Sequence, residues 1–89
     1  MKAVVTVVGK DQVGIIAGVC IKLAEYNVNV LDISQTVMQG YFTMMMVVDV
    51  TDATIPLAQL CTEMDEEGKK RGLSIRLQRE DIFEAMHRV

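Results

Sequence analysis

Residues 27–50, with the sequence NVNVLDISQTVMQGYFTMMMVVDV, determine the fold that we expect for this chain of 89 residues. The pair Gln39-Gly40 separates two extended runs, and a glycine there favours a tight hairpin turn because it accepts a positive φ. After the turn, apolar side chains recur at every second residue, which is typical of a strand with one buried face; they are Phe42, Met44, Met46, Val48 and Val50. The segment therefore predicts an antiparallel hairpin formed by residues 27–38 and 41–50.

The first strand of this hairpin changes its phase part of the way along. Val28 and Val30 share one face, whereas the apolar pattern resumes at Ile33 in the opposite phase. One extra residue in a strand produces such a shift, so we expect a β-bulge near Leu31 and Asp32.

Further elements flank the hairpin on both sides. Residues 3–8 (AVVTVV) form a β-branched run that predicts a buried strand, and residues 73–78 alternate apolar and polar side chains as a strand does. Helical stripes of apolar residues predict one helix over residues 15–26 and another from residue 57 to Gly72. We expect a last short helix from Glu80 onward.

The residues at the helix ends predict how the helices are capped. We expect Asp11 and Gln12 to accept hydrogen bonds from N–H groups at the start of the first helix, and Thr54 to do so at the start of the second. Asn27 and Gly72 tolerate the left-handed conformation that commonly ends a helix.

The predicted order of elements is βαββαβ, followed by a helical tail. With right-handed connections, a hairpin between two crossover helices gives a four-stranded antiparallel sheet with both helices on one face, a ferredoxin-like α+β sandwich. The other face of the sheet then carries Met45 and Val47. We expect the short C-terminal helix or a partner subunit to cover these two side chains.

The composition excludes several classes of protein. Apolar residues make up 51% of the chain, which is too many for a disordered protein and indicates surface that a second copy would cover. Nine basic and twelve acidic residues give a net charge of −3, whereas nucleic-acid binders usually have a basic face. No apolar run approaches the roughly 20 residues of a membrane span. We therefore expect a cytoplasmic protein that binds neither nucleic acid nor a membrane.

Few residues are arranged for catalysis or metal binding. His87 is the single histidine, and its spacing from Cys20 and Cys61 matches no known zinc site. The two cysteines are far apart, and we expect reduced, buried thiols rather than a disulfide. The segment from Gly9 to Gly14 lacks the Gly-Lys-Ser/Thr sequence of a phosphate-binding loop. We expect no enzymatic activity, no metal and no cofactor.

The same segment can still bind a small anion. It connects a strand with a helix, so backbone N–H groups and the helix dipole converge on one point that favours a carboxylate. Gly14 has no side chain, so either a ligand approaches its backbone closely or the glycine only permits a tight turn. The local pattern supports both interpretations.

Three features together resemble the ACT domain, a small regulatory module that binds amino acids. They are the βαββαβ order, the sequence GKDQVGIIA at residues 9–17, and the sequence NVNV at residues 27–30. The resemblance covers residues 1–79, which we take as the domain, and leaves residues 80–89 as a helical tail. The tail is similar to that of stand-alone ACT proteins, and the domain is similar to the ACT halves of the glycine-cleavage transcriptional repressor.

The resemblance implies how the protein would act. ACT domains commonly form homodimers through edge strands, and an amino-acid effector binds between the first loop of one subunit and the second strand of the other. The matching positions, which we expect to bind the ligand, are Asp11, Gln12, Val13, Gly14, Ile15 and Asn29. Gln12 and Val13 replace the arginine and proline that are common in the family, so we expect a less rigid loop.

An alternative function needs no ligand. The protein would then be a pure dimerisation or protein-interaction module that docks on a metabolic enzyme or regulator, through the tail from Glu80 to Val89. The excess of apolar residues and the Met-rich strands favour this alternative. A protein partner that is lost when the tail is removed would distinguish it from an effector-binding module.

Overall fold

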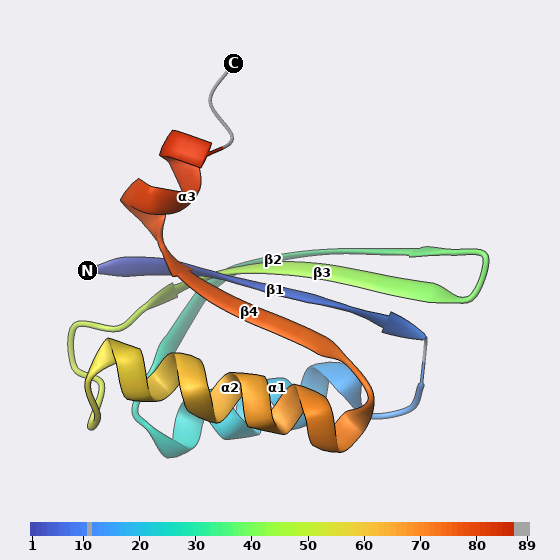
Figure 1. The fold of residues 1–89 in the computed structure, drawn as a ribbon, viewed down its shortest axis with the longest axis horizontal. Coiled ribbons are helices and arrows are strands. Elements are labelled where there is room, and N and C mark those ends of the chain that lie inside the picture. Colours follow the sequence, from blue (N-terminus) through green and yellow to red (C-terminus); the bar gives the residue numbers. More distant parts are fainter. Residues whose placement is uncertain (11, 87–89) are drawn as a thin grey trace.

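The computed structural model describes residues 1–10 and 12–86 (Figure 1). Its elements, in chain order, are β1 (Lys2–Lys10), α1 (Ile15–Glu25), β2 (Asn29–Met38), β3 (Tyr41–Asp49), α2 (Leu57–Arg71), β4 (Ser74–Arg79) and α3 (Glu80–Met86). This order confirms the predicted βαββαβ arrangement with a C-terminal helix. Among the described residues, no helix is long and apolar enough to cross a membrane.

The four strands form one antiparallel sheet in the order β2-β3-β1-β4, so β2 and β4 are its edges. Helices α1 and α2 lie on one face of this sheet, and α3 rises from the opposite face (Figure 1). The predicted ferredoxin-like α+β fold is therefore confirmed. As an edge strand, β2 has no neighbouring strand on one of its sides.

The β2–β3 hairpin has the turn and the bulge that the sequence predicts. Gly40 has a φ of 82°, and Gln39 also takes a positive φ, of 51°. Positive φ angles at both central residues are those of a two-residue type I′ turn, which suits the twist of the two strands. The pairing register shifts between Val30 and Asp32, which confirms the bulge.

The hydrophobic core lies between the sheet and the two helices. Its largest fully buried side chains are Leu23 from α1, Met44 and Met46 from β3, and Leu60 and Met64 from α2. The alternation expected for residues 41–50 is confirmed, because every second residue of β3 faces this core. Each such side chain contributes about 1.5–3 kcal/mol to stability when it leaves water.

The predicted N-terminal caps are wrong where the structure describes them. Helix α1 begins after Gly14 and α2 begins after Pro56, and neither has a side-chain cap. Gln12 instead donates a hydrogen bond to a carbonyl of α2, and Thr54 lies two residues before Pro56. Asp11 lies outside the described residues. Capping propensity identifies residues that can accept these bonds, but the path of the backbone decides which of them reaches the helix end.

The predicted C-terminal ends are confirmed. Asn27 follows the end of α1 with a φ of 60°, and Gly72 ends α2 with a φ of 70°. After α2, the N–H of Leu73 donates to the Gly68 carbonyl at 2.8 Å. This bond and the left-handed glycine form a Schellman motif, which turns the chain from α2 into β4.

Helix α3 covers only part of the open face of the sheet. It packs on β1 and β4, and Val4 of β1 is 5% exposed although it lies on that face. Met45 of β3 stays 39% exposed and Val47 is half-buried. Helix α3 therefore leaves Met45 uncovered, because it stands over the other half of the sheet. The other expected cover, a partner subunit, stays a prediction.

Candidate functional site

The β1–α1 loop presents the backbone of the first turn of α1. Gly14 has a φ of 85°, and no atom lies within 4 Å of the point that a Cβ would occupy. The N–H of Gly18 donates to the Gly14 carbonyl at 2.9 Å and closes the first helical turn. The N–H groups before Gly18 have no acceptor within the helix, since an α-helix leaves its first donors unpaired. These donors and the helix dipole suit a carboxylate.

The side chains expected to bind a ligand in this loop point in different directions. Gln12 donates from Nε2 to the Arg71 carbonyl at 3.1 Å, and Val13 is fully exposed. Ile15 is 3% exposed because its side chain enters the core. Asp11 lies outside the described residues. The structure therefore leaves Val13 and Gly14 exposed in the loop and buries Ile15.

Asn29 lies at the other end of the sheet from this loop. It pairs with Asp49, which pairs with Lys2 at the start of β1. The loop leaves β1 after Lys10, which pairs with Tyr41. The 10 residues of β2 span roughly 30 Å at about 3.3 Å per residue. A single chain therefore does not bring Asn29 to the β1–α1 loop.

A pocket of about 370 Å³ lies beside Asn29. The residues that line it are Ala24, Asn27, Val28, Asn29, Asp49 and Asp52. Asp49 accepts hydrogen bonds from the hydroxyl of Thr51 at 2.6 Å and from its N–H at 2.9 Å, and these bonds hold the pKa of the Asp49 carboxyl below its usual value. Asn27 donates to the Asp52 carbonyl at 3.1 Å. Carboxylates and amide oxygens are acceptors for an ammonium group, so the pocket suits a small amine.

Asp49 and Asp52 were not predicted as site residues from the sequence. Asp49 ends the alternating pattern of β3, and its pairing with Asn29 depends on the register across the bulge. Counting that register through the predicted bulge would have placed Asp49 beside Asn29. No sequence signal connected Asp52 with the site, because it lies in the turn after β3.

The described residues contain no group of three or more His, Cys, Asp or Glu side chains that could hold a metal ion. Cys20 and Cys61 are free and half-buried. The Cys61 thiol donates to the Leu77 carbonyl at 3.3 Å, and burial raises the pKa of this thiol. A protonated thiol is a poor nucleophile and a poor metal ligand, so Cys61 serves packing. His87 lies outside the described residues.

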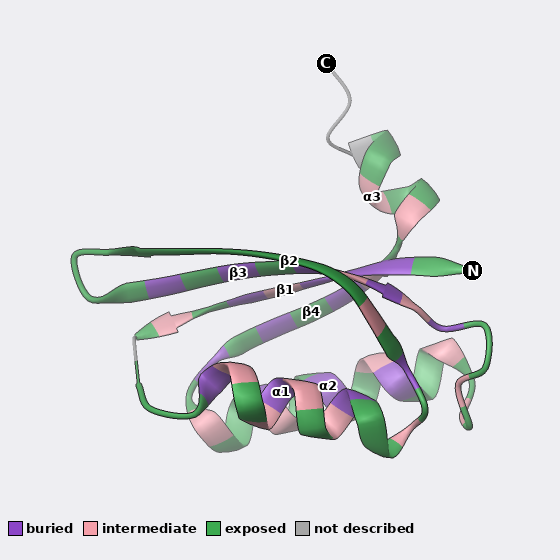
Figure 2. Cartoon of the chain, turned by 180° about the vertical axis from the view of Figure 1, so that it is seen from behind, coloured by how far each residue is buried: buried purple, intermediate pink, exposed green. Residues whose placement is uncertain are grey.

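Strand β2 is an exposed edge of the sheet (Figure 2). Val30 is its only half-buried residue, and the other nine are exposed. Four of the exposed side chains are large and apolar, namely Leu31, Ile33, Val37 and Met38, with 40–68% of their surface accessible. An edge strand also presents unpaired N–H and C=O groups. This edge is therefore suited to pair with another strand.

The chain is similar to known proteins along most or all of its length. The model of the family described as the ACT domain matches residues 2–78. A UPF0237 protein of Clostridium acetobutylicum is 56% identical over 89 residues, which covers 100% of both chains. These matches come from the same region that contains the loop, the edge strand and the pocket.

Solved structures have the same fold. An ACT domain protein from Streptococcus pneumoniae matches with a TM-score of 0.83 and 48% identity, and the match covers 98% of each chain. A protein assigned as a glycine cleavage system transcriptional repressor matches with a TM-score of 0.77 and 22% identity, over 88% of this chain and 44% of that one. The expected resemblance to both kinds of protein is confirmed; at 22% identity the second match shows the fold alone.

Proposed function

Because this chain belongs to the ACT domain family, we propose that it is a non-catalytic regulatory protein that binds a small amino acid between the subunits of a homodimer. One observation carries the proposal. The β1–α1 loop and the pocket beside Asn29 lie at opposite ends of β2, and β2 is an exposed edge strand. Two half-sites at the two ends of one edge are complete only when a second copy pairs with that edge.

Antiparallel pairing of β2 with the same strand of a second copy joins the half-sites. A two-fold axis at the middle of the strand places its start beside the end of the partner strand, so the interface is the same patch on both subunits. The loop of each subunit then lies at the same end of the dimer as Asn29 of the other. The exposed apolar residues of β2 become part of the interface, which explains why this edge is apolar.

The two half-sites have complementary chemistry for an amino-acid zwitterion. The N–H groups at the start of α1 bind the carboxylate, with the helix dipole behind them. Oδ1 of Asp49 already accepts from Thr51 and pairs with the N-terminal ammonium of Met1 at 3.6 Å. Oδ2 of Asp49 and the amide of Asn29 bind the ligand's ammonium group in the pocket. The fully exposed side chain of Val13 then lies beside the bound effector and limits the size of its side chain.

The protein-interaction alternative rests on α3. This helix leaves Ile82 45% exposed, so its apolar side chain is available to pack against a partner. Under this alternative, the protein binds no amino acid, and removal of residues 80–89 abolishes capture of a protein partner. Under the effector proposal, the same truncation leaves the amino-acid site intact.

The test combines light scattering with a calorimetric screen of the twenty common amino acids. We expect a dimer and at least one amino acid that binds. Asn29→Ala removes hydrogen bonds to a charged ligand, which costs about 1.5–3 kcal/mol, or roughly 10- to 100-fold in affinity. Ser74→Ala, on the opposite edge strand, is the matched control and should bind as the unmodified protein does.

A second pair of variants tests the loop. Gly14→Ala and Gly72→Ala both replace a glycine with positive φ in open space, so each costs about 1–2 kcal/mol of stability. Gly14→Ala should weaken amino-acid binding more than Gly72→Ala does, because only Gly14 adjoins the proposed carboxylate site. A protein that binds no amino acid, or one for which both substitutions weaken binding equally, contradicts the proposal.

A further inference from the structure

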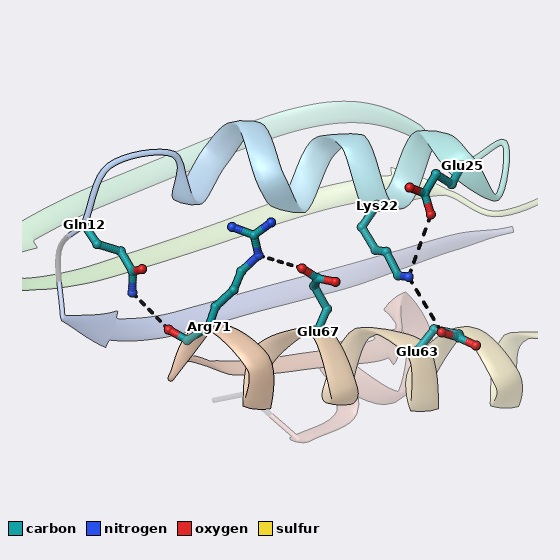
Figure 3. A network of polar contacts seen from close by, with 6 residues as sticks. All are labelled: Gln12, Lys22, Glu25, Glu63, Glu67 and Arg71. Carbon is teal, nitrogen blue, oxygen red and sulfur yellow. Dashed lines mark hydrogen bonds and ion pairs between the residues drawn. The ribbon is translucent and has the colours of Figure 1, made fainter.

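The side chain of Gln12 connects the β1–α1 loop with α2. Nε2 of Gln12 donates to the carbonyl of Arg71, the last residue of α2, at 3.1 Å (Figure 3). The carbonyls of Gly68 and Lys69 are already used by the turn that ends α2. The Arg71 carbonyl is one of the acceptors that a helix end leaves without a partner, so Gln12 satisfies it.

The side chain of Arg71 is also held in place. Its Nε donates to Oε2 of Glu67 at 2.6 Å, one turn earlier in α2, and the Glu67 side chain is 12% exposed (Figure 3). The guanidinium lies directly against the backbone of Gly18 in α1. A Cβ at Gly18 would lie 2.5 Å from Cζ of Arg71, which is closer than atoms pack. A glycine inside a helix is unfavourable, and here it makes room for this contact.

These contacts connect the two parts of the loop to each other through α1 and α2. Gly14 ends the loop, and its carbonyl accepts the N–H of Gly18 at 2.9 Å. Gly18 contacts the guanidinium of Arg71, and the carbonyl of Arg71 accepts the amide of Gln12, near the start of the same loop. We call Gln12, Gly14, Gly18, Glu67 and Arg71 the loop clasp. Farther along the same two helices, Lys22 forms ion pairs with Glu25 at 3.7 Å and Glu63 at 3.8 Å (Figure 3).

We propose that Gln12 is a positioning residue, and that the loop clasp holds the β1–α1 loop in the conformation that aims the first N–H groups of α1 at the effector carboxylate. The assignment rests on the proposed function, and it makes Gln12 a support of the site rather than a ligand contact. The amide of Gln12 is occupied by Arg71, so it is turned toward α2. A loop attached at both ends presents its backbone donors without first having to be ordered by the ligand, which favours binding.

The hydrogen bond from Gln12 to Arg71 also connects the proposed effector site with α2. Any change that an effector makes in the loop alters the bond to the Arg71 carbonyl, and Arg71 directly precedes the turn into β4. By thermodynamic linkage, breaking this hydrogen bond at the end of α2 alters effector affinity by the same factor by which the bound effector alters the equilibrium of the bond.

The test uses Gln12→Glu, which keeps the shape of the side chain but replaces the donor by a carboxylate facing the carbonyl. Hydrogen exchange of the Gly18 backbone amide, which is bonded to the Gly14 carbonyl at 2.9 Å, is measured in the protein without effector. We expect exchange about tenfold faster than in the unmodified protein. Gln12→Arg retains a donor and should restore slow exchange. Gln59→Glu, an exposed residue near the start of α2, is the charge-matched control and should leave exchange unchanged.

Binding is measured on the same variants with a mixture of the twenty common amino acids as the probe. We expect the thermal stabilisation by the mixture to fall in Gln12→Glu and to persist in Gln12→Arg and Gln59→Glu. Unchanged exchange in Gln12→Glu overturns the clasp. Faster exchange with unchanged stabilisation overturns the positioning role. If exchange rises but the unmodified protein gains no stability from the mixture, the clasp stands as a device that orders the loop, and the proposed function falls.

Discussion

Gly68→Ala is expected to destabilise the protein by about 1–2 kcal/mol, although the same change normally stabilises a helix. Gly68 and Gly18 both lie inside helices, in α2 and α1. Replacing a helix-interior glycine by alanine usually stabilises the protein by about 0.5–1 kcal/mol. The two sites differ in what the new methyl group would meet, and this difference reverses the sign at Gly68.

At Gly68 the obstacle is backbone. A Cβ would lie 2.7 Å from the carbonyl oxygen of Leu73 and 3.1 Å from Cγ1 of Ile75. The Leu73 carbonyl cannot move away easily, because the N–H of the same residue is bonded to the Gly68 carbonyl at 2.8 Å. Inserting atoms into such a packed site costs about 1–3 kcal/mol, which exceeds the gain in helix propensity.

At Gly18 the obstacle is the end of a flexible side chain. The Arg71 guanidinium, whose side chain is 35% exposed, can swing into solvent when a methyl group is added. The lost contact with Glu67 is worth about 0–1 kcal/mol for a partly exposed pair. This loss is offset by the helix propensity of alanine, so Gly18→Ala should change the free energy of unfolding by less than about 0.5 kcal/mol.

Urea unfolding followed by circular dichroism measures both variants against the unmodified protein. Each series is run at several protein concentrations, because the proposed dimerisation would make the apparent stability depend on concentration. The midpoint should fall for Gly68→Ala and stay nearly constant for Gly18→Ala, with unchanged slopes. If Gly68→Ala is as stable as Gly18→Ala or more stable than the unmodified protein, the close packing of α2 on the start of β4 is refuted.

Three further predictions concern pH, thiol reactivity and assembly. The hydrogen bond from Arg71 holds the pKa of Glu67 below its ordinary value of 4.5, so its contribution to stability is complete above about pH 4.5 and is lost as the pH falls through the lowered pKa. Glu67→Gln should therefore lose less stability on acidification, as urea midpoints measured at decreasing pH would show. Burial raises the pKa of Cys61, so iodoacetamide should alkylate it at least about tenfold more slowly in the native protein than in urea, as mass spectrometry would detect. Ile33→Lys places a charge on the exposed edge strand and should give a folded monomer by light scattering; an unchanged dimer would exclude β2 as the interface.

Local patterns predicted the elements of this fold because their causes are local. The alternation in residues 41–50 predicted β3, and the phase change before Ile33 predicted the bulge. Asn27 and Gly72 predicted two helix ends, since few residues adopt a positive φ without strain. Each of these features depends on the residue itself and its immediate neighbours along the chain.

The N-terminal caps show where local reasoning fails. Gln12 has a side chain that can cap a helix, and its position before α1 made that role reasonable. In the structure its amide donates instead to a carbonyl 59 residues further along the chain. The sequence identifies hydrogen-bonding groups, but which partner each one meets depends on how the helices pack.

The candidate site also combines features that the sequence predicts with features that depend on packing. The sequence by itself determined the order of elements, Gly14 at the end of the loop, and Asn29 as a residue of the second strand. Only the tertiary structure decided that Asn29 lies at the far end of the sheet from that loop, beside Asp49 and the pocket. The physical reason is that backbone conformation follows from short-range sterics and periodicity, whereas proximity between distant residues follows from strand register and packing, which no short segment contains.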